Sequence, residues 1–108
     1  MAILQPTNPE RSLFFEIMRE IDEEYKWNGD CMAGRNHSRF GEILEIGPVV
    51  ISIIMDELDA DRPSWLYYLI LENLTKVRPW PPTSAGKFDD IQKAWQGWWE
   101  VQKIIEAA

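Results

Sequence analysis

Cys31 and His37 are the only cysteine and histidine of the chain, and they are its nearest approach to a catalytic pair. A cysteine nucleophile needs a positioned base, a group that orients that base and an oxyanion hole. No motif supplies the last two, so we interpret the pair as a loop thiol beside a surface histidine. General acid–base catalysis by an Asp or Glu near His37 is the remaining enzymatic hypothesis. The sequence therefore favours a protein that is not an enzyme.

A cluster of carboxylates, Asp56, Glu57, Asp59 and Asp61, could supply oxygen ligands to a hard cation such as Ca²⁺. The spacing lacks the turn glycine and the bidentate glutamate of such a loop, so it favours a solvated helix end. No phosphate-binding loop occurs either, because Gly86-Lys87 lacks the upstream glycine and the following Ser or Thr. We expect no metal ion and no cofactor.

Tryptophan is frequent, with six in 108 residues. Three lie on predicted inner helix faces and are expected in the core: Trp65, Trp95 and Trp98. Trp99 lies about 100° from Trp98 around the same helix, so we expect it to be exposed. Exposed aromatic side chains are typical binding anchors. The candidates for this role are Trp27, Trp80 and Trp99, with Tyr67 or Tyr68. The alternative is that they pack on loops or against a second copy.

The chain is acidic, with 18 Asp+Glu against 11 Lys+Arg and a formal charge of -7. This balance repels phosphate backbones, and no stripe of Lys or Arg is present, so nucleic-acid binding is disfavoured. Acidic side chains concentrate on one predicted helix, from which they could steer the protein to a basic partner. These candidate binding residues are Glu16, Glu20, Asp22, Glu23 and Glu24.

The helix that carries these carboxylates is predicted over residues 9–26, with Asn8 as N-cap and Pro9 at the first helical position. Apolar residues recur along it at helical spacing: Leu13, Phe14, Ile17, Met18, Ile21 and Tyr25. Residues 28–38 are rich in turn-forming side chains and have no periodicity, so we expect a flexible loop there. Ser38 is available to cap a short following helix.

The segment 49–55 is apolar and rich in β-branched residues, which suits a buried helix or a buried strand. We favour a helix, because Pro48 stands at a helix start and no partner strand occurs elsewhere.

Two more helices are predicted, over 65–75 and from Phe88 to Ile105. The Pro-rich segment 79–82 is interpreted as a connector that folds Trp80 over the core, rather than as a polyproline ligand. Gly97 is expected to admit a bulky neighbour.

These elements predict an all-α fold: a compact bundle of four to five antiparallel helices, with a HEAT-like helical hairpin over 48–75. The length and a 45% hydrophobic content suit one globular domain, 1–108. The longest apolar run is far shorter than the ~20 residues that span a bilayer. A single cysteine and the lack of a signal-peptide pattern predict a cytoplasmic protein without a membrane partner.

Residues 37–99 resemble a group of small uncharacterised prokaryotic helical proteins. The resemblance rests on His37-Ser38-Arg39-Phe40, an Ile-rich helix ending in Glu57-Leu58, Pro63-Ser64-Trp65, and a final helix with Trp95 and Trp98. The chain departs from the pattern where Lys76 follows Thr75, because the pattern has glycine there. The resemblance implies an accessory protein, encoded beside toxin–antitoxin or mobile-element genes, that interacts rather than catalyses. It brings no catalytic motif.

The functional hypothesis is a small acidic protein-interaction module that binds and inhibits a partner protein with a basic surface, as an antitoxin, immunity or phage anti-defence factor would. In this hypothesis, charge supplies the rate of association and aromatic side chains supply affinity. The alternative is a structural or adaptor subunit, or a homodimer, that uses Trp99 and the apolar side of the last helix. An enzyme is the least favoured reading.

Overall fold

The computed structural model describes residues 3–27, 29 and 33–107. It contains five α-helices: α1 (Asn8–Tyr25), α2 (Phe40–Ile46), α3 (Val49–Asp59), α4 (Trp65–Thr75) and α5 (Phe88–Ala107). Two short 3₁₀ turns, η1 (Ala33–Asn36) and η2 (Pro82–Ser84), lie in the connections. The described residues form no strand, so the all-α prediction is confirmed.

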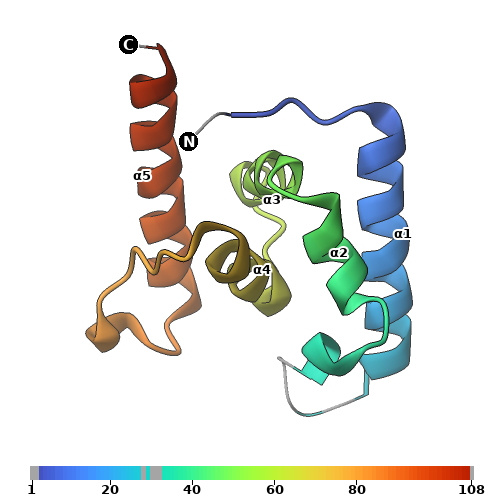
Figure 1. Ribbon diagram of the computed structural model, residues 1–108. Helices are drawn as coiled ribbons and strands as arrows, with labels where there is room; N and C mark the ends of the chain where they lie inside the picture. The colour runs from blue at the N-terminus through green and yellow to red at the C-terminus, as the bar shows by residue number, and fades with distance from the viewer. Residues whose placement is uncertain (1–2, 28, 30–32, 108) are drawn as a thin grey trace.

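Helix α3 is the centre of the fold and contacts α1, α2, α4 and α5. Figure 1 shows it nearly end-on, between α1 on one side and α5 on the other. Eight of its 11 residues are buried, from Val49 to Met55 and again at Leu58. A helix that is apolar on all sides is one that other elements surround. This explains why a β-branched segment is helical here: its side chains are covered by helices rather than by a neighbouring strand.

Helix α1 begins one residue earlier than predicted, because Thr7 and not Asn8 is its N-cap. The backbone N–H of Glu10 donates to Thr7 Oγ1 at 3.3 Å, and the N–H of Thr7 donates to Glu10 Oε1 at 2.8 Å. This reciprocal capping box satisfies two backbone donors that the helix itself leaves unpaired. Four apolar residues of α1 face the core: Phe14, Ile17, Met18 and Ile21.

The segment predicted as a flexible loop, 28–38, is in part a packed element. Residues 28 and 30–32 lie outside the described part of the chain, but Ala33 and Gly34 are buried in η1. A Cβ placed on Gly34 would lie 2.5 Å from Leu66 Cδ1 and 2.7 Å from Ile21 Cγ2. The glycine therefore lets the backbone approach α1 and α4 closely, which turn propensities alone do not reveal. Ser38 does not cap α2, whose N-cap is Arg39 without a side-chain hydrogen bond.

Helix α5 faces the core with a different tryptophan pair than predicted. Ile91, Trp95 and Trp99 are buried, whereas Trp98, predicted in the core, is half-buried and packs against the core. The core contact follows a spacing of four residues along the helix, which places Trp99 above Trp95 and turns Trp98 toward the edge. The expected role of Gly97 is also wrong, because it is exposed and a Cβ placed there would meet nothing within 4 Å.

Two further features complete the fold. Trp65 and Trp80 are half-buried and pack against the core, as a connector over 79–82 would require. Lys76 ends α4 in the left-handed conformation, with φ 61°, and its N–H donates to the carbonyl of Glu72. A lysine thus performs the C-cap turn that usually takes glycine.

Within the described chain, no helix is both long enough and apolar enough to cross a membrane.

Candidate functional site

The exposed face of α1 carries a row of acidic side chains that ends at a tryptophan. Glu16, Glu20 and Glu23 follow one another at spacings of four and three residues, and Trp27 lies four residues further. With Glu24 beside them, the four glutamates share one face of α1, and Trp27 follows in the turn after the helix; we call these five residues the acidic ridge. All five are exposed, and Trp27 is 90% exposed. The ridge therefore joins negative charge to a large apolar side chain.

Asp22 lies on a different side of α1 from the ridge. It lines a second hollow with Phe15, Met18 and Tyr67 among its walls. Partial burial there raises the pKa of the Asp22 carboxyl above its ordinary value, because desolvation disfavours the charged form. Glu23 lines both this hollow and the one beside the other glutamates, so Asp22 is offset around the helix from the ridge but adjoins it at Glu23.

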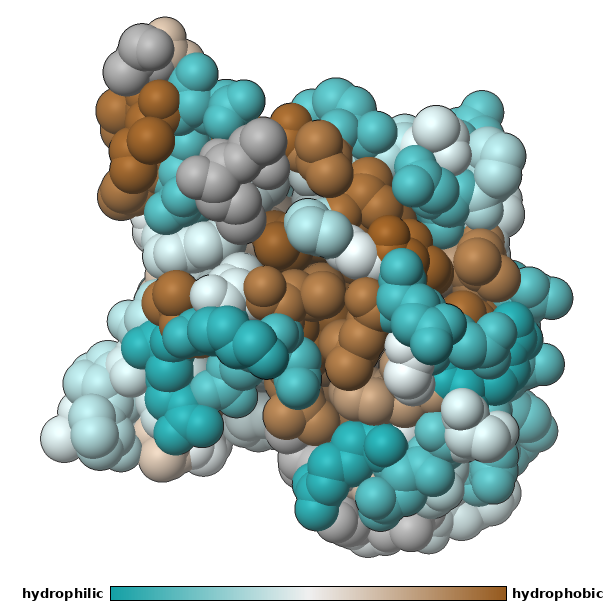
Figure 2. All heavy atoms as spheres, viewed as in Figure 1, coloured by the Kyte–Doolittle hydropathy of each residue, from teal (hydrophilic) through white to brown (hydrophobic). Residues whose placement is uncertain are grey.

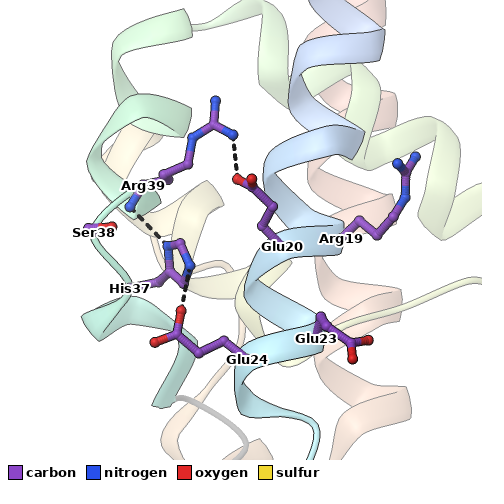
Figure 3. A pocket seen from close by; sticks show the side chains of 7 residues that line it. All are labelled: Arg19, Glu20, Glu23, Glu24, His37, Ser38 and Arg39. Atoms are coloured by element: carbon purple, nitrogen blue, oxygen red, sulfur yellow. Dashed lines mark hydrogen bonds and ion pairs between the residues drawn. The ribbon is translucent and has the colours of Figure 1, made fainter.

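Two cations pair with carboxylates of the ridge: Arg39, from the segment that follows η1 (Figure 3), and Lys26, at the end of α1. Arg39 pairs with Glu20 and, at 2.7 Å, with Glu42 on α2. The hydrogen bonds that the Arg39 guanidinium donates to Glu42 and to Glu20 raise its pKa, so it stays charged. Lys26 binds Glu23 at 2.8 Å. These contacts offset the repulsion between glutamates four residues apart on one helix.

His37 uses both ring nitrogens in structural contacts. Its Nδ1 accepts the backbone N–H of Arg39 at 3.0 Å, so its Nε2 carries the proton and lies 2.7 Å from Glu24 Oε2 (Figure 3). The ring also packs edge-on against Tyr25, and only 9% of the side chain is exposed. A general base needs a free nitrogen within reach of its substrate. In this arrangement His37 instead ties its segment to the end of α1. Cys31, its suggested partner, lies outside the described residues.

A shallow hollow of about 650 Å³ lies between α1 and this segment. Every side chain that lines it ends in a polar or charged group: Arg19, Glu20, Glu23, Glu24, His37, Ser38 and Arg39. Figure 3 shows Glu20 and Glu24 turned toward Arg39 and His37, with Arg19 and Glu23 directed away from them. The hollow is open to solvent and is a surface for contact rather than an enclosed site. Glu16 has no ion pair among the described residues.

Three of the aromatic residues predicted as anchors are buried instead. Trp99 is 5% exposed, and Tyr67 and Tyr68 are also buried. Tyr67 packs on Phe14 of α1, while Tyr68 packs on Phe88 of α5, with ring centroids 5.1 Å apart. Helix α4 lies between α1 and α5. Tyr67 is therefore covered from the side of α1, and the next residue, Tyr68, from the side of α5.

Trp80 is separate from the ridge. The Arg78 guanidinium lies 4.8 Å from the centre of the Trp80 ring. Together they border a hollow of about 450 Å³ whose walls include Trp65 and Leu69. Tyr67 lines a hollow with Asp22 and Glu23 but is itself buried, so Trp27 is the only predicted aromatic anchor that is an exposed side chain beside the acidic row.

The Tyr68 hydroxyl is buried without a hydrogen-bond partner in the described structure. Tyr68→Phe is expected to raise the free energy of unfolding at pH 7 by about 1–2 kcal/mol, because an unsatisfied buried hydroxyl is removed without loss of volume. Tyr67→Phe is the matched control: Tyr67 lines an open hollow, so its change at pH 7 should be smaller. Urea unfolding of both variants measures the difference, and equal effects would contradict the expectation.

The same two tyrosines predict a loss of stability in alkali. Burial raises the pKa of Tyr67 and of Tyr68 above the ordinary value. The folded protein therefore keeps both protons where the unfolded chain loses them, so the free energy of unfolding is unaffected below about pH 10 and falls above it. Either Tyr→Phe variant should reduce this fall when unfolding is compared at pH 9 and pH 11. An unchanged fall would show that other groups cause it.

The acidic residues at the end of α3 point to separate partners. Asp56 binds Arg11 at 2.7 Å and Glu57 pairs with Arg62, while Asp61 accepts a hydrogen bond from Gln92 at 3.4 Å. Among the residues that the structure describes, no group of three or more His, Cys, Asp or Glu side chains is placed to hold a metal ion.

Sequence reasoning missed Arg39 and His37 as partners of the acidic face. A signal was present, since both basic side chains follow the acidic helix after a turn-rich segment that must fold back. Comparison of the chain with protein-family models, with curated proteins and with solved structures gave no match in any of the three.

Proposed function

We propose that this protein is a small acidic interaction module that binds a partner protein with a basic surface and inhibits it by covering that surface. The observation that carries the proposal is Trp27, 90% exposed at the end of a row of exposed carboxylates. An antitoxin, an immunity protein or a phage anti-defence factor would act in this way. The single cysteine supports a location in the reducing cytoplasm.

The two parts of the ridge have different tasks in this proposal. Trp27 offers the large, rigid contact area that dominates many protein interfaces once a partner excludes water from it. Lys26 Nζ lies 5.7 Å from the centre of the Trp27 ring. This cation–π contact can persist on one face of the ring while a partner covers the other face. The carboxylates would raise the rate of encounter with a positive surface and orient it.

The contacts of Arg39 and His37 support this use of the ridge, because they order it before any partner arrives. Glu20 and Glu24 are each held from a second element, so less side-chain freedom remains to be lost on binding. Glu16, which has no ion pair in the described chain, is the carboxylate most available to a cation of the partner. It is therefore the residue to change.

The test is capture of a partner from host lysate by the tagged protein, followed by kinetics with the purified partner. Trp27→Ala is expected to weaken binding by about 2 kcal/mol, mainly through faster dissociation. Glu16→Lys should slow association and flatten its dependence on salt. Asp59→Lys is the matched control, because it makes the same charge change at an exposed residue outside the ridge and at the end of α3.

Asp59→Lys should leave association close to that of the original protein. If both charge reversals slow association equally, net charge and not the ridge is responsible. A partner that binds Trp27→Ala as tightly as the original protein would contradict the proposed anchor.

A further inference from the structure

The hollow that Asp22 lines combines apolar walls with polar groups, and its volume is about 530 Å³. Phe15 and Met18 of α1 are its aliphatic and aromatic walls, and Tyr67 is its one wall from α4. Three charged side chains complete the set that we call the Asp22 hollow: Arg19, Glu23 and Lys26. The volume lies within the range of about 300–1,000 Å³ that is usual for ligand sites. The hollow is therefore large enough to receive a side chain from another molecule.

Two polar groups of the Asp22 hollow have no partner in the part of the chain that the structure describes. The Asp22 carboxylate forms no ion pair or hydrogen bond there, and Tyr67 Oη forms no hydrogen bond. Tyr67 is only 8% exposed, so water has little access to it. The pKa of Tyr67 is raised by burial and then by the negative charges of Glu57 and Asp22, so both carboxylates lie close to its hydroxyl. Glu57 already pairs with Arg62, which leaves Asp22 as the unpaired carboxylate beside Tyr67.

The two cations that line the hollow do not neutralise Asp22. Lys26 Nζ binds Glu23 at 2.8 Å and lies 5.7 Å from the centre of the Trp27 ring. Figure 3 shows the Arg19 side chain extending away from Glu23, and no ion pair joins Arg19 to Asp22. Burial raises the pKa of the Asp22 carboxyl, and no neighbouring cation is placed to lower it. A cation supplied from outside would remove this penalty.

We infer that the Asp22 hollow seats a lysine or arginine side chain of the basic partner, with the alkyl stem against Phe15 and Met18 and the cation between the Asp22 carboxylate and Tyr67 Oη. Such a side chain has an apolar stem and a charged end, in the same order as the walls of the hollow. Its N–H groups can donate to both oxygens, and the bond to the carboxylate is charge-assisted. The inference rests on the proposed function, because it names the part of the partner that the acidic side of α1 recognises.

The position of the hollow allows one partner to contact it and the acidic ridge together. Glu23 lines the Asp22 hollow and also the hollow beside the other glutamates. In Figure 2 hydrophilic surface gathers on the right, where Figure 1 places α1, whereas apolar surface gathers in the centre and at the projecting end of α5. A basic surface attracted to the ridge therefore brings its cationic side chains close to Asp22.

NMR titration of the full chain with single-residue probes tests the seat. The cationic probes are the N-acetyl methylamides of arginine and lysine, and the neutral probes of matched shape are those of citrulline and norleucine. Both cationic probes should shift the amide resonances of Asp22 and Tyr67, and the neutral ones should bind at least about tenfold more weakly. The tighter of the two cationic probes identifies the preferred side chain. Cationic probes that bind no better than their neutral counterparts would overturn the inference.

Two variants locate the binding of the cationic probes. Asp22→Asn should weaken it about tenfold, and Tyr67→Phe about threefold, because each removes an acceptor of the cation. Asp59→Asn is the matched control, since it makes the same change at an exposed residue at the end of α3, and it should have no effect. Equal losses from Asp22→Asn and Asp59→Asn would mean that net charge attracts the probes, and the seat would be rejected.

These titrations need no partner protein, so they test the seat separately from the proposed function. Cationic probes that bind the original chain and not Asp22→Asn support the seat even when host lysate yields no partner. A partner whose binding depends on Trp27, together with cationic probes that do not bind, would overturn the seat and leave the proposed function standing.

Discussion

Trp99→Ala is expected to lower the free energy of unfolding by about 3–5 kcal/mol, the range for truncating a buried aromatic side chain. Trp99 is 5% exposed and stands one turn beyond Trp95, which is fully buried. Its removal leaves a cavity between α5 and the rest of the core that the surrounding side chains fill only partly. Urea unfolding followed by circular dichroism measures the loss, at a concentration low enough to keep self-association out of the comparison.

Trp98→Ala is the matched comparison, because it is the same substitution one residue away. Trp98 is half-buried and packs edge-on against Trp95, with ring centroids 5.4 Å apart. Its truncation should cost about half as much as that of Trp99, or less, because part of its surface is already in water. Equal losses, or a larger loss for Trp98→Ala, would mean that the helix faces the core in the orientation first predicted from sequence.

Gly34→Val is expected to destabilise the fold by about 1–3 kcal/mol through overpacking. The new side chain would occupy the space of Leu66 Cδ1 and Ile21 Cγ2, and both of those residues are buried. Relief of the clash requires η1 to move away from α1. His37 and Arg39, which follow η1, would then lose their positions beside Glu24 and Glu20. The variant should therefore both unfold at lower urea and become more sensitive to proteolysis between α1 and α2.

Two comparisons separate this clash from a general effect of glycine replacement. Gly41→Ala adds a Cβ where nothing lies within 4 Å, and it should be neutral or stabilise α2 by up to about 1 kcal/mol. Leu66→Ala opens space beside Gly34, so its cost and that of Gly34→Val should be less than additive when combined. Full additivity would show that Leu66 is not what the valine meets.

The local pattern of the sequence was enough to determine the helices. Apolar residues at helical spacing determined α1, α4 and α5, because a helix must bury one face whatever it packs against. Pro48 and the absence of a partner strand were enough to favour a helix over 49–55. The ridge carboxylates were also identifiable, since their spacing depends on one helix alone, and Trp27 was identifiable as an aromatic residue at the end of that helix.

Tertiary packing decided which of two adjacent residues is buried and which distant residues contact one another. Trp98 and Trp99 are equally apolar, and only the rotation of α5 on the core determines that Trp99 is buried. Tyr67 and Tyr68 are both covered because α4 has neighbours on two sides. Gly34 lies against Ile21 and Leu66, residues far from it in sequence, so its role depends on a contact that turn propensity does not describe.

The same division holds for the candidate site. Periodicity placed the four ridge glutamates on one helix face, but Arg39 and His37, the partners of Glu20 and Glu24, come from a segment whose composition indicated only a loop. The composition of a helix face depends on residues three and four apart, so sequence reveals it. The partner of each side chain depends on how the elements pack in three dimensions, which is why only the tertiary structure shows it.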